Sequence, residues 1–181
     1  MTPMQKALAA AGIRSGECFQ LASILDGKIH CATFRHNGKG RKAGREWALL
    51  ENSFGKNVYL CLNPVPKAQG TRRAKAKDVG RTHALLIDID PDDGPPELPL
   101  QVARDIHARY GGALIDSGRG AQVWAQLHPK IDRRRFLRAV ARRFTCLGIK
   151  IDPTQDPARL ARLPGYTNSR TGRRACLIAT S

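Results

Sequence analysis

Short stretches of the chain alternate apolar and polar residues with a period of two, which is typical of β-strands. The alternation continues on both sides of Asp26-Gly27 and predicts a hairpin with its turn at these two residues. Further strands are expected at residues 57–65, 83–90, 113–118 and 121–127, and a short apolar piece at 149–151 resembles another strand. The predicted structure is therefore rich in short, hairpin-connected strands.

Three segments show helical signals instead. Residues 2–12 combine a Thr2 cap, Pro3 at the first helical position and a glycine stop. Residues 100–110 place apolar side chains on one face and end at a Gly-Gly pair, and Asp132 precedes an arginine-rich amphipathic helix that is expected to end at Gly148. Two Gly-containing basic stretches, 35–47 and 67–81, are predicted to be loops, the first of them mobile.

The order of these elements favours an α+β fold, because strands and helices interleave without a regular βαβ succession and without an internal repeat. A length of 181 residues suits one domain. We expect a single domain over residues 1–181, in which 1–56 elaborate a core at 57–175.

Charge changes the picture, since the chain carries 31 Lys and Arg against 15 Asp and Glu. The balance is 14 to 5 over residues 1–80, 4 to 7 over 81–128 and 13 to 3 over 129–181. Two basic regions thus enclose an acidic middle. A field of this size attracts polyanions, which makes nucleic acid the favoured partner over a merely solvated surface.

Targeting and cysteine patterns restrict the location. No apolar stretch is long enough to span a bilayer and no secretory signal is recognisable, so we expect a cytoplasmic protein without a membrane partner. The five cysteines are widely spaced and lack a C-x-x-C pair, which argues against both a disulfide framework and a zinc site.

The acidic middle contains four aspartates within residues 88–93. Asp88 and Asp90 lie two positions apart at the end of an apolar strand, so their side chains share one face. Two adjacent carboxylates repel each other unless a cation lies between them, and Mg²⁺ or Mn²⁺ would remove that cost. An acidic turn at a strand end is the alternative, and Asp92 and Asp93, past a proline, are assigned to such a turn.

Two later segments add chemistry to these carboxylates. Residues 116–124, DSGRGAQVW, form a small-residue turn that lets backbone amides approach an anion, although it is also an ordinary β-turn. Residues 151–168, IDPTQDPARLARLPGYTN, contain Asp152 near their start, followed by arginines. Together they supply what nucleotidyl transfer needs: carboxylates for metal ions and arginines for phosphate charge.

In this order, LLIDID, DSGRGAQVW and IDPTQDPARLARLPGYTN resemble the three motifs of the archaeo-eukaryotic primase superfamily. The nearest likeness is to the RepB-type replication primases of plasmids, and it covers roughly residues 57–175. The resemblance implies a catalytic core with an RRM-like antiparallel sheet and an adjoining α/β unit, two Mg²⁺ or Mn²⁺ ions, and primer synthesis on a single-stranded DNA template from nucleoside triphosphates.

The resemblance also implies roles for individual residues. The catalytic metal ligands would be Asp88, Asp90 and Asp152. Nucleotide-binding roles would fall to Ser117, Gly118, Arg119, Gln122, Arg159, Arg162, Asn168 and Arg170. The basic segments and one aromatic residue, expected to stack on a base, give the DNA-binding candidates Arg41, Lys42, Arg72, Arg73, Arg134, Arg138 and Tyr166. Trp124 is expected in the core.

Two features depart from the wider superfamily. Many of its members have histidine where Gln122 stands, and plasmid primases carry a carboxyl-terminal helical bundle that this chain lacks. The chain is then either an excised catalytic domain or one that relies on a helper protein, alongside a replicative helicase or polymerase. Two other functions stay open: a catalytically silent module that binds single-stranded DNA, and a metal-dependent nuclease.

Overall fold

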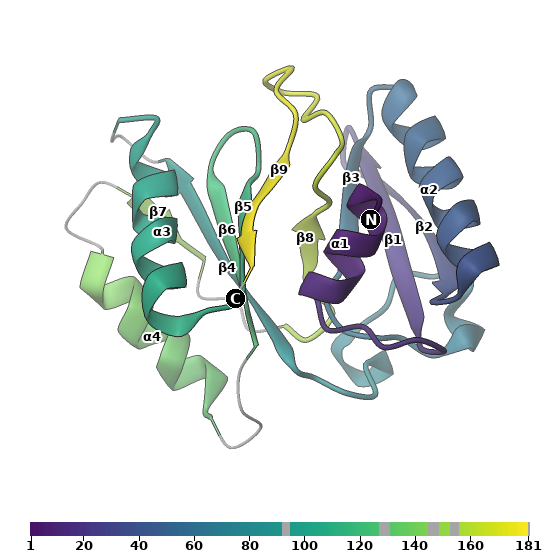
Figure 1. The fold of residues 1–181 in the computed structure, drawn as a ribbon, viewed down its shortest axis with the longest axis horizontal. Coiled ribbons are helices and arrows are strands. Elements are labelled where there is room, and N and C mark those ends of the chain that lie inside the picture. Colours follow the sequence, from purple (N-terminus) through teal and green to yellow (C-terminus); the bar gives the residue numbers. More distant parts are fainter. Residues whose placement is uncertain (92–94, 127–130, 145–148, 153–155, 181) are drawn as a thin grey trace.

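Two antiparallel sheets stand side by side in the computed structural model, with helices over their outer sides and α1 where the sheets meet (Figure 1). The structure describes residues 1–91, 95–126, 131–144, 149–152 and 156–180. Every strand pairing in these ranges is antiparallel. The predicted α+β class is confirmed.

The first sheet has the strand order β2-β1-β3-β8. Its strands are β1 (Cys18–Leu25), β2 (Lys28–Arg35), β3 (Asn57–Cys61) and β8 (Leu160–Arg162). Leu25 pairs with Lys28 across a two-residue turn, in which Asp26 has φ 49° and Gly27 has φ 76°. Positive φ at both turn residues matches the twist of the strands they join, so the predicted Asp-Gly hairpin is confirmed.

The second sheet has the order β7-β4-β6-β5-β9. It contains β4 (Ala84–Pro91), β5 (Ala113–Asp116), β6 (Ala121–Gln126), β7 (Ile149–Ile151) and β9 (Cys176–Thr180). Sequence patterns predicted the first four of these strands. They missed β9, and also β8 in the other sheet, because both are short and lie in arginine-rich or terminal segments.

Three helices agree with their sequence signals. In α1 (Pro3–Ala10), the Thr2 hydroxyl caps the first turn, and α3 (Leu98–Tyr110) ends at Gly111. In α4 (Arg133–Phe144), Asp132 accepts a hydrogen bond from the Arg135 amide at 3.0 Å. The predicted end of this helix at Gly148 lies outside the described residues.

The predicted mobile loop at residues 35–47 is wrong, because most of it belongs to α2 (Gly38–Ser53). Asn37 caps the helix by accepting a hydrogen bond from the Gly40 amide at 2.8 Å. A Cβ at Gly44 would lie 3.1 Å from the Phe19 ring, so the glycine lets the helix approach β1 closely. Tertiary packing therefore outweighs the low helix propensity of glycine.

The second predicted loop, 67–81, is irregular apart from two short 3₁₀ turns, Lys67–Gln69 and Ala76–Asp78. No helix of the described residues has the length and apolar character needed to cross a membrane.

One apolar core joins the two sheets. It contains Leu8 of α1, Phe19 of β1 and Leu60 of β3 together with Leu86 and Trp124 of the second sheet. The first 56 residues thus supply two helices and two paired strands to the same core that the motif-bearing segments use. Trp124 is fully buried, as predicted.

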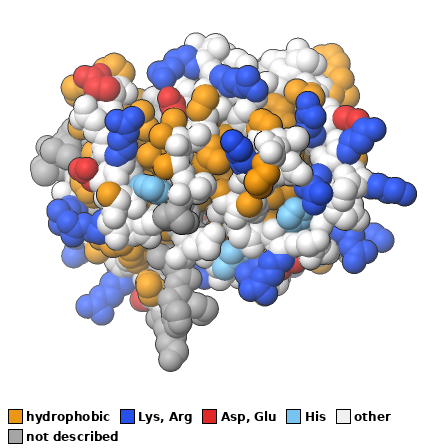
Figure 2. Space-filling model, in the orientation of Figure 1, with side chains coloured by type: hydrophobic (Ala, Val, Ile, Leu, Met, Phe, Trp, Pro, Cys, Tyr) orange, Lys and Arg blue, Asp and Glu red, His pale blue; other side chains and the backbone are white. Residues whose placement is uncertain are grey.

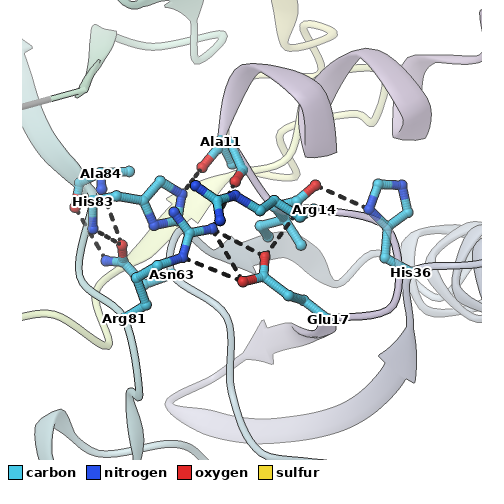
Figure 3. A network of polar contacts seen from close by, with 10 residues as sticks. Ala11, Arg14, Glu17, His36, Asn63, Arg81, His83 and Ala84 are labelled. Carbon is cyan, nitrogen blue, oxygen red and sulfur yellow. Dashed lines mark hydrogen bonds and ion pairs between the residues drawn. The ribbon is translucent and has the colours of Figure 1, made fainter.

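A polar network also connects the segment after α1 to the start of β4 (Figure 3). Arg81 forms an ion pair with Glu17 at 3.1 Å, and the Nε2 of His83 donates a hydrogen bond to the Ala11 carbonyl oxygen at 2.6 Å. The Asn63 side-chain oxygen accepts hydrogen bonds from the His83 and Ala84 amides. These contacts help fix where β4 enters its sheet.

Candidate active site

Strand β4 places its two aspartates on one face. Ile87 and Ile89 pack with α3 and α4 on the opposite face, so alternation directs Asp88 and Asp90 away from those helices. Asp88 lies opposite Gln122 of β6, and Asp90 lies opposite Lys150 of β7. The shared face predicted from the sequence spacing is what the strand register produces.

Asp152 directly follows β7 and lies next to β4, the strand that carries Asp88. Its amide donates a hydrogen bond to the Asp88 carbonyl oxygen at 3.1 Å, although 64 positions separate the two residues. Its carboxylate forms an ion pair with Arg159. Within the described ranges, no group of three or more His, Cys, Asp or Glu side chains is arranged to hold a metal ion. The third motif is therefore adjacent to the first, but the Asp152 carboxylate points to Arg159.

A cavity of about 390 Å³ lies at this face. It brings together predicted site residues from all three motifs: Asp88, Asp90, Ser117, Arg119, Gln122, Arg162, Asn168 and Arg170. Asp152, Gly118 and Arg159 are absent from its lining. The fold therefore gathers most of the predicted metal and nucleotide residues around one polar space.

The electrostatics of this cavity centre on Asp88. Burial is the main cause that raises the pKa of Asp88 to about 6, and the hydrogen bond from Gln122 partly opposes this rise. The charges of Asp90 and Asp152 raise the pKa further, whereas Arg159 lowers it. A carboxylate held in this way gains from any cation that enters the cavity, because the cation stabilises its ionised form.

Gln122 connects three strands through one side chain that is only 4% exposed. Its amide nitrogen donates to the Asp88 carboxylate at 3.0 Å. Its oxygen accepts from the Arg162 backbone amide at 3.0 Å and from the Trp124 indole at 3.3 Å. Gln122, which was predicted to contact the nucleotide, thus uses both the nitrogen and the oxygen of its side-chain amide in hydrogen bonds within the protein.

Arg162 brings a buried positive charge to the same cavity. Its side chain lies over the Tyr59 ring, with 4.4 Å between the guanidinium carbon and the ring centroid, and the residue is 8% exposed. Burial lowers its pKa, while the charges of Asp88 and Asp90 raise it. Its Nη1 is buried with no hydrogen-bond partner among the described residues. Because Arg162 lines the cavity, its positive charge favours an anionic ligand there.

The small-residue turn of the second motif is held by the third. Gly118 has φ 83°, and its amide donates to the Asp116 carboxylate at 2.7 Å. The Gly120 amide donates to the Ser117 hydroxyl at 3.0 Å, and the Asn168 side chain donates to the Ser117 carbonyl at 3.1 Å. Because the turn satisfies these two glycine amides internally, the expectation that backbone amides are free for an anion is wrong for Gly118 and Gly120.

The predicted DNA-binding residues lie outside the cavity. Arg41 and Lys42 are on α2, and Arg134 and Arg138 are on α4. Arg72 forms an ion pair with Asp78 at 3.2 Å, and Arg73 is exposed.

Tyr166, expected to stack on a base, is only 5% exposed and packs in the core that joins the sheets. Its position after Pro164-Gly165 indicated a turn but gave no sign that the ring points inward. The structure leaves no open ring face for a base at this position, which corrects that expectation.

Sequence reasoning missed one whole wall of the cavity. The tip of the β1–β2 hairpin, Ile24 to Gly27, lines it together with Asn57, Tyr59 and Ser169. The hairpin itself was predictable from its Asp-Gly turn. Its position opposite β4 depends on how the two sheets pack, and no local pattern encodes that.

No protein-family model matches the sequence, and no curated protein matches it significantly. Solved structures do resemble it. The AEP domain of the primase-polymerase from cyanophage S-2L matches with a TM-score of 0.66 and 16% identity, covering 99% of this chain and 89% of that one. The catalytic domain of primase RepB′, in complex with initiator DNA, matches with a TM-score of 0.63 and 16% identity over 98% and 83% of the two chains.

A further structure of primase RepB′ matches with a TM-score of 0.61 and 17% identity. It covers 99% of this chain but 57% of that one, so this chain spans little more than half of that RepB′ chain. These identities support a conclusion about fold. The chain has the fold of the catalytic domains of archaeo-eukaryotic and RepB′-type primases, as its three motifs predicted.

Proposed function

We propose that this chain is a DNA primase or primase-polymerase, which synthesises short primers on single-stranded DNA from nucleoside triphosphates. The observation that carries the proposal is the cavity that joins the carboxylates of Asp88 and Asp90 to the largely buried, positively charged Arg162. Such a space accommodates metal-bound phosphate. The motif resemblance to RepB-type proteins supports replication of a plasmid or another mobile element as the setting, with a helicase, polymerase or helper protein as partner.

The carboxylates fit the divalent ions that this fold implies. Asp88 and Asp90 offer hard oxygen ligands on one side of the cavity, which suits Mg²⁺ or Mn²⁺. Asp152 is close enough in the backbone to join them if its carboxylate leaves Arg159. When bound, the two ions would stabilise the charge that develops on the attacking and leaving oxygens.

The remaining residues would bind and orient the nucleotide. Arg162, with Arg119 and Arg170 on the cavity wall, offsets the charge of the triphosphate. In the reaction, a 3′-hydroxyl gives its proton to solvent and its oxygen forms a bond to the α-phosphorus, while the bond from that phosphorus to the departing pyrophosphate breaks. Arginines near the leaving group stabilise the pyrophosphate charge as it forms.

Substituting Asp88→Asn or Asp90→Asn tests this function, because each change keeps the side-chain shape and removes a negative charge. We expect primer synthesis on labelled single-stranded DNA with Mn²⁺ and nucleotides to fall by at least about 100-fold. DNA binding should persist or tighten, because a negative charge near the DNA is lost. Asp105→Asn on α3, an exposed acid outside the cavity, is the matched control.

The same incubation separates the alternatives by product length. Lengthened products that depend on Asp88 support the primase. Shortened DNA would identify a nuclease that uses these carboxylates, and unchanged DNA with tight binding would identify a catalytically silent module.

A further inference from the structure

Among the helices that the structure describes, α4 has the highest density of basic residues. Six arginines occur within its 12 residues and no acid does. Four of these arginines, together with Asp132 and Ala139, line a shallow hollow of about 380 Å³: Arg134, Arg135, Arg138 and Arg142. Figure 2 shows Lys and Arg side chains around the lower left of the molecule, where Figure 1 places α4.

Four other arginines have acidic partners, which the arginines of the α4 hollow lack among the described residues. Arginines 72, 81, 159 and 173 each form an ion pair with an Asp or Glu. In the part of the chain that the structure describes, none of the four arginines of the α4 hollow does so. Their positive charge is therefore available to an external polyanion.

A partly exposed aromatic side chain contacts α4 at Phe136, outside the hollow. Tyr110, the last residue of α3, is 39% exposed and packs edge-on against Phe136 of α4, with 5.0 Å between the ring centroids. Arginines that contact phosphates, and exposed rings on which bases can stack, are features by which proteins hold single-stranded nucleic acid.

The α4 surface is separated from the candidate active site by a sheet. Leu137 and Val140 of α4 pack with Ile87 and Ile89 of β4, whereas Asp88 points to the opposite face of that strand. The nucleotides bound at α4 would therefore be different from those that lie in the cavity.

From these observations we propose that the arginines of α4 and Tyr110 form a second surface for single-stranded DNA, on the far side of the sheet from the cavity. This surface would hold a stretch of the template away from the reacting nucleotides. The inference extends the proposed function, but binding at α4 requires neither metal nor nucleotide and can be tested without catalysis.

The first test compares two variants that lose the same charge. Arg138→Gln/Arg142→Gln removes two arginines from the hollow, and Lys6→Gln/Arg14→Gln removes two exposed cations elsewhere. Affinity for a fluorescent single-stranded oligonucleotide is measured against salt concentration, with metal and nucleotide absent. For two lost phosphate contacts, we expect the slope of log K against log salt to shrink by about 1.4, or roughly 25-fold weaker binding at 0.1 M salt.

Equal losses in both variants would mean that net charge alone sets the affinity, and this result would overturn the proposal. An α4 variant that binds like the parent would overturn it too, and would favour an acidic protein as the partner of this surface. Thermal melts of both variants establish that each is folded.

The second test addresses the aromatic ring. Tyr110→Ala should weaken binding to single-stranded DNA roughly 10-fold and leave duplex binding at its parental value, because duplex bases are not free to stack. Phe54→Ala, which removes a ring that is 63% exposed just after α2, is the control and should change neither. Equal weakening for both DNA forms would contradict a stacking role. If the α4 surface binds single-stranded DNA but the chain does not incorporate nucleotides, the proposed enzyme activity is wrong and the DNA-binding role of α4 is still supported.

Discussion

At the scale of single residues, Gln122 links the first and third motifs of the candidate site through its side-chain amide. Its position in the second motif predicted a nucleotide contact. In the structure, its amide holds the Asp88 carboxylate on one side and the Arg162 backbone and Trp124 indole on the other. We therefore expect Gln122 to act by positioning the carboxylate and the third motif.

Gln122→Met tests this role, because it keeps the side-chain volume and removes every hydrogen bond. Nucleotide incorporation should fall at least about 10-fold with a higher Mg²⁺ requirement, since Asp88 is no longer oriented. Stability should fall by about 1–3 kcal/mol, because the Arg162 amide and Trp124 indole lose their acceptor. Single-turnover rates at several Mg²⁺ concentrations and a denaturant titration measure the two effects. A rise in nucleotide KM alone would instead indicate direct contact with the nucleotide.

At the scale of secondary-structure elements, α2 shows how packing decides a segment with ambiguous local signals. Residues 38–53 include three glycines near the amino end, which favoured a loop. The helix forms because its glycines allow close approach to the first sheet. A Cβ at Gly40 would clash with the Arg35 backbone carbonyl oxygen, and one at Gly44 would press on Phe19.

Two alanine substitutions in the first turn of α2 should therefore have opposite outcomes. Gly38→Ala meets no atom within 4 Å and should be neutral or stabilise the protein by up to about 1 kcal/mol through helix propensity. Gly40→Ala should destabilise it by about 1–3 kcal/mol, because the helix or the end of β2 must shift. Urea unfolding of both variants measures the difference. Similar stability for the two would show that α2 does not pack as the structure has it.

At the scale of the whole molecule, the network in Figure 3 links acid sensitivity to the junction between the sheets. Burial lowers the pKa of His83, although its hydrogen bond to Ala11 opposes this. Burial raises the pKa of Glu17, but hydrogen bonds from the Arg14 amide and Arg81 outweigh it, so the net pKa is below its usual value. Both groups therefore bind fewer protons in the folded chain than in the unfolded one.

The free energy of unfolding should consequently fall in two stages as the pH decreases. The His83 contribution begins to decline near its usual pKa of 6.5, and the Glu17 contribution is present above 4.5 and is lost as the pH falls through the depressed folded value. Denaturant titrations at pH 7.5, 5.5 and 4 measure the decline. Glu17→Gln should flatten the more acidic stage, whereas the exposed Glu46→Gln should not. If the Glu17→Gln variant loses as much unfolding free energy at acidic pH as the parent does, Glu17 is not the cause of that loss.

The sequence by itself determined the features that depend on neighbouring residues. The alternation around Asp88 and Asp90 placed both on one face, Asp26-Gly27 produced a two-residue hairpin, and Thr2 and Asp132 capped their helices. Three motifs in order also indicated the primase fold. These signals are local, because strand period, turn geometry and capping depend on residues a few positions apart.

Only the tertiary structure decided how distant segments meet. Sheet pairing brought Asp152 to Asp88, but an ion pair turned its carboxylate to Arg159. Packing of the two sheets buried Tyr166 and placed the β1–β2 hairpin over the cavity. It also put the arginines of α4 on the far face of the second sheet. These outcomes arise from contacts between residues far apart in the chain, whose free energies exceed any local preference of the segments involved.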